Sequence, residues 1–202
     1  LPLFTPQYPD VQVVLHEAAV PELTKLAEDS VIDFCVMHIP TDLTELSYEL
    51  IMRERVFLIG HKDHPLLRGL DSPYDRPLHF TQLRQLEHER IVMLPSDWRL
   101  AKLLYNTFSV LNVEPQNILV TTNNTTAINL AAGNMGFAFL QESGISRTPY
   151  LDRLACFTIG EPPLTCPTAV VYKKNGFLSP AARAFIDLTK DFYRKFNRDG
   201  TF

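Results

Sequence analysis

Residues 125–140, TTAINLAAGNMGFAFL, decide the fold class of this chain. The first half predicts a short helix over Thr125–Ala132, and the unbroken apolar run Phe137–Leu140 is typical of a strand covered on both faces. We interpret Gly133 and Gly136 as residues that let the backbone turn between the helix and the strand. A helix that leads straight into a buried strand is a repeating step of α/β domains.

The alternation of strand and helix continues on the N-terminal side of this stretch and indicates one α/β lobe. Its predicted elements are the helix Thr81–Glu89, the strand Arg90–Leu94, the helix Trp98–Leu111 and the strand Asn117–Thr122. Ser96 or Asp97 is the expected N-cap of the longer helix, because both residue types accept hydrogen bonds from the free N–H groups of a first turn.

A second lobe is predicted from the two ends of the chain. Its elements are the tail of a helix at Leu1–Tyr8, the strand Val11–Leu15, the helix Pro21–Asp29, the strands Asp33–Met37, Glu49–Gly60 and Thr168–Tyr172, and a helix that Ser179 caps. Strand, helix and strand over residues 11–37 indicate a parallel βαβ unit.

The terminal helix needs a sheet to cover, so we assign residues 1–68 and 168–202 to one lobe and residues 69–167 to a second, inserted lobe. The predicted fold class is α/β, with two Rossmann-like lobes joined by two crossover strands. Ligands of open α/β sheets bind outside the carboxyl ends of the strands, which predicts a binding cleft between the lobes.

Composition narrows the possible functions. The 202 residues carry a formal net charge of −4 without a dense basic run, so this chain alone is not expected to bind DNA. The cysteines and histidines lack metal-site spacing, and no metal or cofactor is expected. The sequence has no nucleophile elbow and no P-loop, which argues against an enzyme. The alternatives are a solute-binding protein of transport and, after it, an α/β transferase or dehydratase.

Four motifs together give the chain a family resemblance. Phe4 followed by Tyr8-Pro9-Asp10-Val11, the turn His64-Pro65-Leu66, the segment 129–140 and the segment Leu178–Phe185 occur in the order found in LysR-type effector domains, which the chain resembles. The resemblance implies a type II periplasmic-binding-protein-like fold and the ligand-sensing part of a cytoplasmic transcriptional regulator. It also implies a homodimer or tetramer, a further strand and polar loop ahead of Leu1, and DNA contact only through a winged helix-turn-helix that this sequence does not contain.

Candidate effector contacts in the inserted lobe lie where strands lead into helices. At Ser96, Asp97, Trp98 and Arg99, the free N–H groups of a helix start favour an anionic ligand. Ser96 can donate a hydrogen bond, Arg99 can pair with a carboxylate, and Trp98 can form a wall of the pocket. The alternative is that Ser96 only caps its helix and that Arg99 faces solvent.

Further candidates lie at the next junction and in the first lobe. They are Asn123, Asn124 and Thr125, which otherwise serve as a helix cap, and Ala19, Val20 and His38. The family usually has a hydroxyl where Ala19 and Val20 stand. Either the pocket is more apolar on this side, or the effector is held mainly by a loop ahead of Leu1 and by the second lobe. For His38, a solvated or locally bonded side chain is the alternative.

Overall fold

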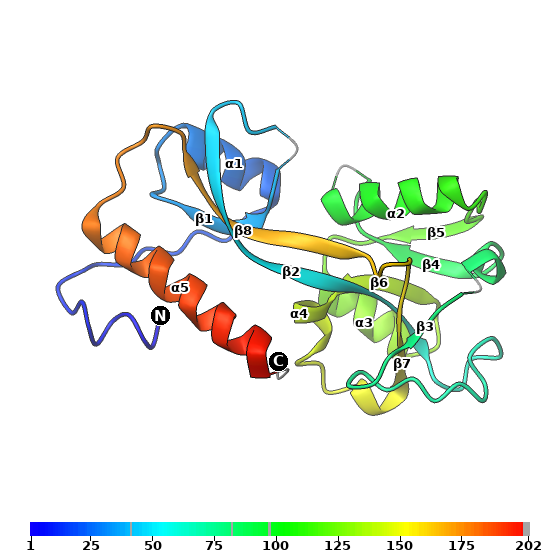
Figure 1. Cartoon of the computed structure of the whole chain (residues 1–202). Helices are drawn as coiled ribbons and strands as arrows, with labels where there is room; N and C mark the ends of the chain where they lie inside the picture. The colour runs from blue at the N-terminus through cyan, green and yellow to red at the C-terminus, as the bar shows by residue number, and fades with distance from the viewer. Residues whose placement is uncertain (41, 82, 97, 200–202) are drawn as a thin grey trace. The chain divides into compact units, whose positions relative to one another are not determined.

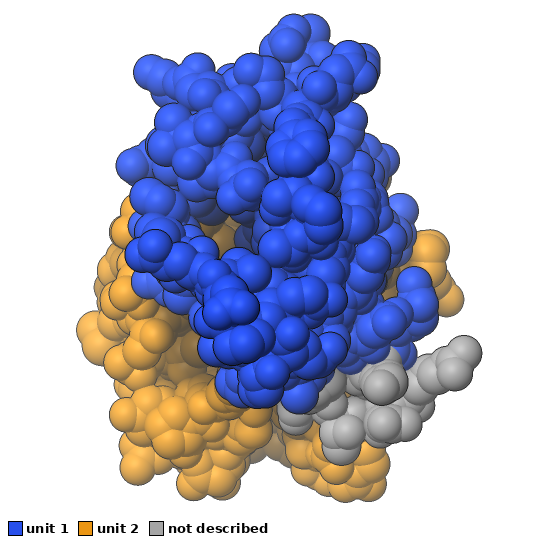
Figure 2. All heavy atoms as spheres, turned by 90° about the vertical axis from the view of Figure 1, so that its left-hand side faces the viewer, with its two compact units in different colours: residues 1–53, 167–201 blue, residues 54–166, 202 orange. Residues whose placement is uncertain are grey.

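The computed structural model describes residues 1–40, 42–81, 83–96 and 98–199, and the chain divides into two compact units. Unit 1 consists of Leu1–Arg53 with Pro167–Thr201, and unit 2 contains Glu54–Cys166; Figure 2 colours them separately. Both divisions fall inside long strands, β2 (Leu46–His61) and β8 (Thr165–Lys173). The first division therefore comes before the predicted one after Arg68, because no turn marks it within β2.

Unit 2 is built on a sheet with a parallel part and an antiparallel part. The strands β6 (Phe137–Gln141), β4 (Arg90–Met93) and β5 (Asn117–Val120) run parallel in that order. The second half of β2 pairs antiparallel with β6 and with β7 (Leu154–Thr158), and β3 (Leu78–His79) lies parallel to β7. The helical elements are α2 (Arg99–Val110), α3 (Asn124–Ala132), α4 (Glu142–Ile145) and the 3-10 turns Leu83–Leu86 and Leu151–Arg153.

Helices cover both faces of this sheet (Figure 1). Every residue of β6 is buried, and its side chains alternate between two hydrophobic clusters. Phe139 packs in one cluster with residues of α2, and Leu140 packs in the other with residues of α3. The apolar run Phe137–Leu140 is thus part of a strand covered on both faces, as predicted.

Unit 1 contains a smaller sheet with one helix against each face. The strand β1 (Cys35–His38) pairs antiparallel with β8, which neighbours β2. The helix α1 (Val20–Glu28) packs on the cluster that includes Met37 and Val171. The helix α5 (Pro180–Asp199) lies on the other face, where the rings of Phe185 and Phe34 are 5.5 Å apart. Ser179 caps α5, as predicted, by accepting a hydrogen bond from the backbone N–H of Ala182 at 3.1 Å.

The first twenty residues differ from the prediction. Leu1–Tyr8 forms consecutive turns with two helix-type hydrogen bonds, from Thr5 N–H to the Leu1 carbonyl and from Tyr8 N–H to the Phe4 carbonyl, rather than a continuous helix. Val11–Leu15 is irregular, so the predicted strand and its parallel βαβ unit are wrong for the described chain. These residues have high β-propensity, but a strand forms only where a neighbour pairs with its backbone.

Other differences are smaller. The predicted helix Thr81–Glu89 is reduced, in the described residues, to the 3-10 turn Leu83–Leu86. The strand β7 and the short helix α4 had no counterpart in the prediction. Within the described residues, no helix combines the length and the apolar character that crossing a membrane requires.

Candidate functional site

The carboxyl ends of three parallel strands share one edge of the sheet in unit 2. In the register of β4 and β5, Met93 stands opposite Val120, and the N–H of Thr121 donates to the Met93 carbonyl at 3.0 Å. The neighbouring strand β6 is parallel to β4 and ends at the same edge. The chain leaves these strands toward α2, α3 and α4, so the structure brings together the predicted contacts Ser96, Trp98, Arg99, Asn123, Asn124 and Thr125. Asp97 lies outside the described residues.

The entry to α2 differs from the predicted capping. Its N-cap residue is Trp98, whose side chain makes no capping hydrogen bond, so the prediction of Ser96 as N-cap is wrong. Ser96 is exposed, and Trp98 is half-buried against the hydrophobic cluster that contains Phe139. Trp98 therefore fixes the start of the helix by packing, which leaves the Ser96 hydroxyl on the surface beside it.

Arg99 is half-buried at the same edge, close to Cys166. Burial raises the pKa of the Cys166 thiol, while a hydrogen bond with Gln141 and the positive charge of Arg99 act in the opposite direction. The negative charge of Glu54 adds to the rise in the pKa of Cys166. Arg99 thus belongs to a polar group at the strand ends rather than to the open solvent.

The entry to α3 is capped by a predicted site residue. The side-chain oxygen of Asn123 accepts a hydrogen bond from the N–H of Thr126 at 3.1 Å, which is the ordinary role of Asn at this position. Asn124 is half-buried, and its amide nitrogen would lie 3.3 Å from a Cβ placed on Gly144 of α4. Thr125 is exposed. The side chain of Asn124 therefore lies next to α4, at the third strand-to-helix junction.

The third junction contains buried polar residues that are not among the predicted contacts. Glu142, the first residue of α4, accepts two hydrogen bonds from the guanidinium of Arg55, one of them at 3.0 Å. Glu54 accepts a hydrogen bond from the N–H of Ser143 at 3.1 Å. Burial, followed by the negative charge of Glu142, raises the pKa of the Tyr74 hydroxyl well above its usual value. One sequence feature could have indicated these residues: the apolar run Phe137–Leu140 is followed at once by the polar residues Gln141–Ser143.

The predicted contacts in unit 1 lie around the start of α1 and the end of β1. Ala19 is the N-cap residue of α1, is exposed and provides no side-chain cap, whereas Val20 packs against the core of its unit. The His38 ring nitrogen Nδ1 lies 3.3 Å from the hydroxyl of Thr168, its partner in the register of β1 and β8. His38 is thus locally bonded, which agrees with the alternative interpretation of this residue.

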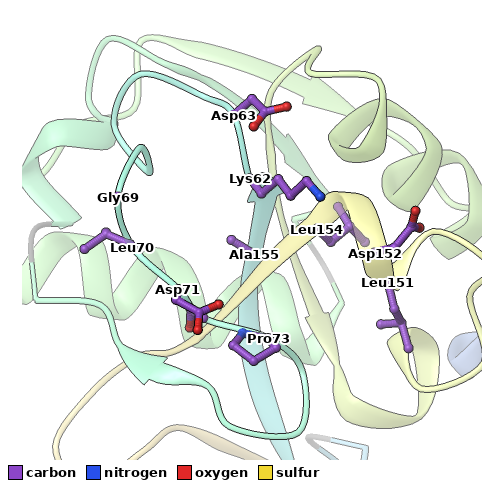
Figure 3. Close-up of a pocket in the computed structure, with 11 residues that line it drawn as sticks. Lys62, Asp63, Gly69, Leu70, Asp71, Pro73, Leu151, Asp152, Leu154 and Ala155 are labelled. Atoms are coloured by element: carbon purple, nitrogen blue, oxygen red, sulfur yellow. The ribbon is translucent and has the colours of Figure 1, made fainter.

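Unit 2 contains a hollow of about 470 Å³, and none of the predicted contacts lies in its lining (Figure 3). Its lining includes one basic side chain, Lys62, and three acidic ones, Asp63, Asp71 and Asp152. The side chain of Ser72, also in the lining, is already hydrogen-bonded to the Cys156 carbonyl and the Leu78 N–H. This surplus of carboxylates does not favour an anionic ligand.

Comparison with known proteins connects this chain to a family of regulators. A family model described as the LysR substrate binding domain matches residues 1–194. Two HTH-type transcriptional regulators of Bacillus subtilis (strain 168) are similar over 94% of this chain: YwbI at 23% identity and YvbU at 21%. The chain spans about 60% of the length of these curated relatives.

Solved structures with the same fold carry small molecules. The effector-binding domain of BenM with its effector benzoate has a TM-score of 0.77 at 20% identity, over 96% of this chain and 84% of that one. The regulatory domain of Synechocystis PCC6803 CcmR in complex with 2-PG has a TM-score of 0.77 at 19% identity, over 96% and 88%. The effector-binding domain of QuiR in complex with shikimate has a TM-score of 0.77 at 16% identity, over the same shares.

Proposed function

Because this chain belongs to the LysR substrate-binding domain family, we propose that it senses a small, carboxylate-bearing effector for a LysR-type transcriptional regulator. The family resemblance and the α/β fold class predicted from the sequence are both confirmed. The family is one of transcriptional regulators rather than of transport proteins, so the solute-binding alternative is not retained. An enzymatic role is not proposed either.

The observation that carries the effector proposal is the shared strand edge of unit 2. The helices α2 and α3 both begin at this edge, and the first turn of each helix presents backbone N–H groups with a partial positive charge. Arg99 adds a full positive charge at the same edge. An anion held by these groups gains charge-assisted hydrogen bonds, each worth about 1.5–3 kcal/mol.

The proposed pocket uses Ser96, Asp97, Trp98 and Arg99 with the turn Asn123–Thr125. It is completed from the other lobe, residues 1–68 and 168–202, by Ala19, Val20 and His38. Ala19 and Val20 offer no hydroxyl group, which favours an effector with an apolar side opposite its carboxylate. Three related domains support this chemistry, since the small molecules in their structures are benzoate, 2-PG and shikimate.

The remaining parts of the proposal concern the whole regulator. We place the protein in the cytoplasm as a homodimer or tetramer that contacts DNA through an N-terminal winged helix-turn-helix outside these 202 residues. The full-length relatives are HTH-type regulators, and this chain spans about 60% of their length. With a net charge of −4, the chain itself is a poor partner for phosphates.

The test begins with a thermal-shift screen of small carboxylates, because a ligand at about 100 times its Kd adds about 2.7 kcal/mol of stability. Calorimetry of the best effector should then show binding weakened about tenfold or more by Arg99→Ala and by Ser96→Ala. Arg84→Ala is the matched control, because Arg84 is exposed and precedes β4, at the opposite edge of the sheet.

Two results would contradict the proposal. Unchanged affinity in Arg99→Ala, Ser96→Ala and Asn124→Ala would place the site elsewhere. A cationic or neutral effector would remove the argument from charge.

A further inference from the structure

Glu54 is a buried carboxylate at the strand edge that carries the effector proposal. Val56 of β2 stands opposite Gln141, the last residue of β6, so Glu54 lies just beyond the carboxyl end of that strand. Glu54 is only 3% exposed, and its carboxylate accepts a hydrogen bond from the N–H of Ser143 at 3.1 Å. A buried charge is costly unless other groups compensate it, so the groups around Glu54 indicate what this edge can bind.

Successive side chains of a strand point to opposite faces of the sheet, which separates Glu54 from its neighbour Arg55. Val56 and Leu58 pack in the hydrophobic cluster that contains residues of α2, which places Glu54 on the face that α2 covers. Phe57 packs in the cluster that contains residues of α3, and the guanidinium of Arg55 lies 5.0 Å from the centre of its ring. The charge of Arg55 is therefore on the other face of the sheet.

On that other face, the charge of Arg55 is compensated by Glu142. The guanidinium donates two hydrogen bonds to the Glu142 carboxylate, one of them at 3.0 Å. The hydroxyl of Tyr74 donates a further hydrogen bond to this carboxylate at 3.4 Å. Because two opposite charges in such close contact largely cancel at a distance, the pair contributes little to the field on the α2 face.

On the α2 face, Glu54 and Arg99 act on the same side chain, the thiol of Cys166. Burial raises the pKa of this thiol, a hydrogen bond with Gln141 and the positive charge of Arg99 lower it, and the negative charge of Glu54 raises it further. Coulomb interactions weaken with distance, so both charges must lie close to the thiol. The edge therefore presents a positive and a negative group a short distance apart.

The balance of charge at this edge still favours an anion. Arg99 and Glu54 carry opposite unit charges that offset each other, whereas the first turns of α2 and α3 each add about half a positive charge. A ligand with a net negative charge therefore fits better than a zwitterion. A plain carboxylate has this charge, but it has no group that can donate a hydrogen bond to Glu54.

A hydroxyl group next to the carboxylate matches both charged residues. The ligand's carboxylate can accept hydrogen bonds from Arg99 and from the N–H groups of the helix starts, while the hydroxyl donates to Glu54, since a carboxylate has about four acceptor sites. Because Arg99 and Glu54 lie close to the same thiol, the two ligand groups must also be close together, as they are when the hydroxyl is on the α-carbon. A hydrogen bond from a hydroxyl to a carboxylate belongs to the stronger, charge-assisted class.

We propose that the effector is an α-hydroxy acid and that Glu54 selects it by accepting a hydrogen bond from its hydroxyl group. This inference rests on the proposed function, because it concerns the same strand edge, and it adds a second polar group to the carboxylate of the effector. The residues that carry it all belong to unit 2.

Matched sets of acids test the inference by thermal shift and then by calorimetry on the full-length protein. The sets are succinate, malate and aspartate; hydrocinnamate, phenyllactate and phenylalanine; and isocaproate, hydroxyisocaproate and leucine. Within a set, the carbon next to the carboxylate carries hydrogen, hydroxyl or ammonium. In the set that binds best, we expect the hydroxy acid to bind about tenfold more tightly than the other two. Equal or tighter binding of the plain or the amino acid would overturn the inference and leave the proposed function standing, whereas no binding of any of these acids would contradict both.

Variants of Glu54 separate the effect of its charge from a structural role. Glu54→Gln keeps an oxygen that can accept from the Ser143 N–H but removes the charge, so the protein should lose most of its preference for the hydroxy acid over the plain acid. Glu54→Asp keeps the charge and should keep the preference. Glu114→Gln is the matched control, because Glu114 is exposed and precedes β5, at the opposite edge of the sheet. An unchanged preference in Glu54→Gln, or an equal loss in Glu54→Asp, would show that the charge of Glu54 does not select the effector.

Discussion

At the scale of single residues, Glu49 on β2 forms hydrogen bonds with side chains of α5 and β8. Its carboxylate accepts hydrogen bonds from Lys190 at 2.6 Å, from Tyr172 at 3.1 Å and from Arg183. Burial alone would raise the pKa of Glu49, but these three donors outweigh it and lower the pKa from 4.5 to about 2. The charged form is therefore the one that stabilises unit 1.

This balance predicts a pH-dependent effect of Glu49→Gln. A carboxylate with a lowered pKa contributes stability above its unfolded value of 4.5, and the contribution is lost as the pH falls toward about 2. We expect the variant to lose about 1–2 kcal/mol at pH 7, or about 2–4 °C in Tm for each kcal/mol. The loss should shrink below pH 4.5. Glu45→Gln, at an exposed position just before β2, should have no such effect at either pH; a pH-independent difference for Glu49→Gln would contradict the assignment.

Single residues also show how far sequence reasoning reaches into the site. The capping role of Asn123 at the start of α3 could be predicted from the sequence, because its hydrogen-bond donor, the N–H of Thr126, is only three positions away. The pairing of Arg55 with Glu142 could not be predicted from the sequence, because the two residues are 87 positions apart and come together only when β2 pairs with β6. Contacts that depend on strand register are beyond local patterns.

At the scale of elements, the turn from α3 into β6 depends on one glycine. Gly136 has φ +146°, and a Cβ on it would lie 2.6 Å from the carbonyl oxygen of Arg90 in β4. Gly133 adopts φ −88°, and the left-handed position between them is taken by Asn134 with φ 55°. The predicted freedom to turn is thus required at Gly136 and not at Gly133.

We expect Gly136→Ala to destabilise unit 2 by about 1–3 kcal/mol, because both the backbone angle and the contact with β4 are unfavourable to a side chain. Urea denaturation measures the difference. Gly69→Ala is the matched control: Gly69 also has positive φ, 85°, but no atom lies within 4 Å of the added Cβ. A loss in Gly136→Ala no larger than that in Gly69→Ala would show that the contact with Arg90 costs nothing.

The elements that the sequence predicted well are those in which the spacing of apolar residues shows which side chains are buried. The strand β6 and the helix α2 have strong patterns and form close to their predicted bounds. The strand β7 was missed because Leu154–Thr158 is short and lies between turns, and its partner β2 is almost a hundred residues away. Residues 11–15 show the opposite error, since their composition favours a strand but no described segment pairs with them.

At the scale of the whole molecule, the arrangement of two lobes around an effector stays a prediction of the sequence and the family. The described units have separate cores, and each division lies within a strand rather than in a linker. A boundary inside a strand leaves no mark in composition, which is why the predicted boundary after Arg68 differs from the division within β2. The alternation of elements predicts the fold class, whereas the point of division depends on which contacts form.

The exposed apolar residues of unit 2 predict self-association. Val110 at the end of α2 is 82% exposed, and Val120 on β5, the last strand in its sheet, is 59% exposed. The family resemblance places the helix Trp98–Leu111 and residues 117–122 antiparallel to the helix ending at Tyr8 and residues 11–15 of a second copy, in an interface with twofold symmetry. We expect light scattering of a protein in which the predicted helix ending at Tyr8 is complete to show a dimer at high micromolar concentration.

Charged substitutions at these positions should break that dimer. Val120→Asp and Val110→Asp each bury a carboxylate in the predicted interface, so both should raise the dimer dissociation constant at least tenfold. Leu70→Asp is the control, because Leu70 is also exposed, at 42%, but lies outside the predicted surfaces. A strict monomer before substitution would refute the dimer, and an equal weakening by Leu70→Asp would show that the contact lies elsewhere on unit 2.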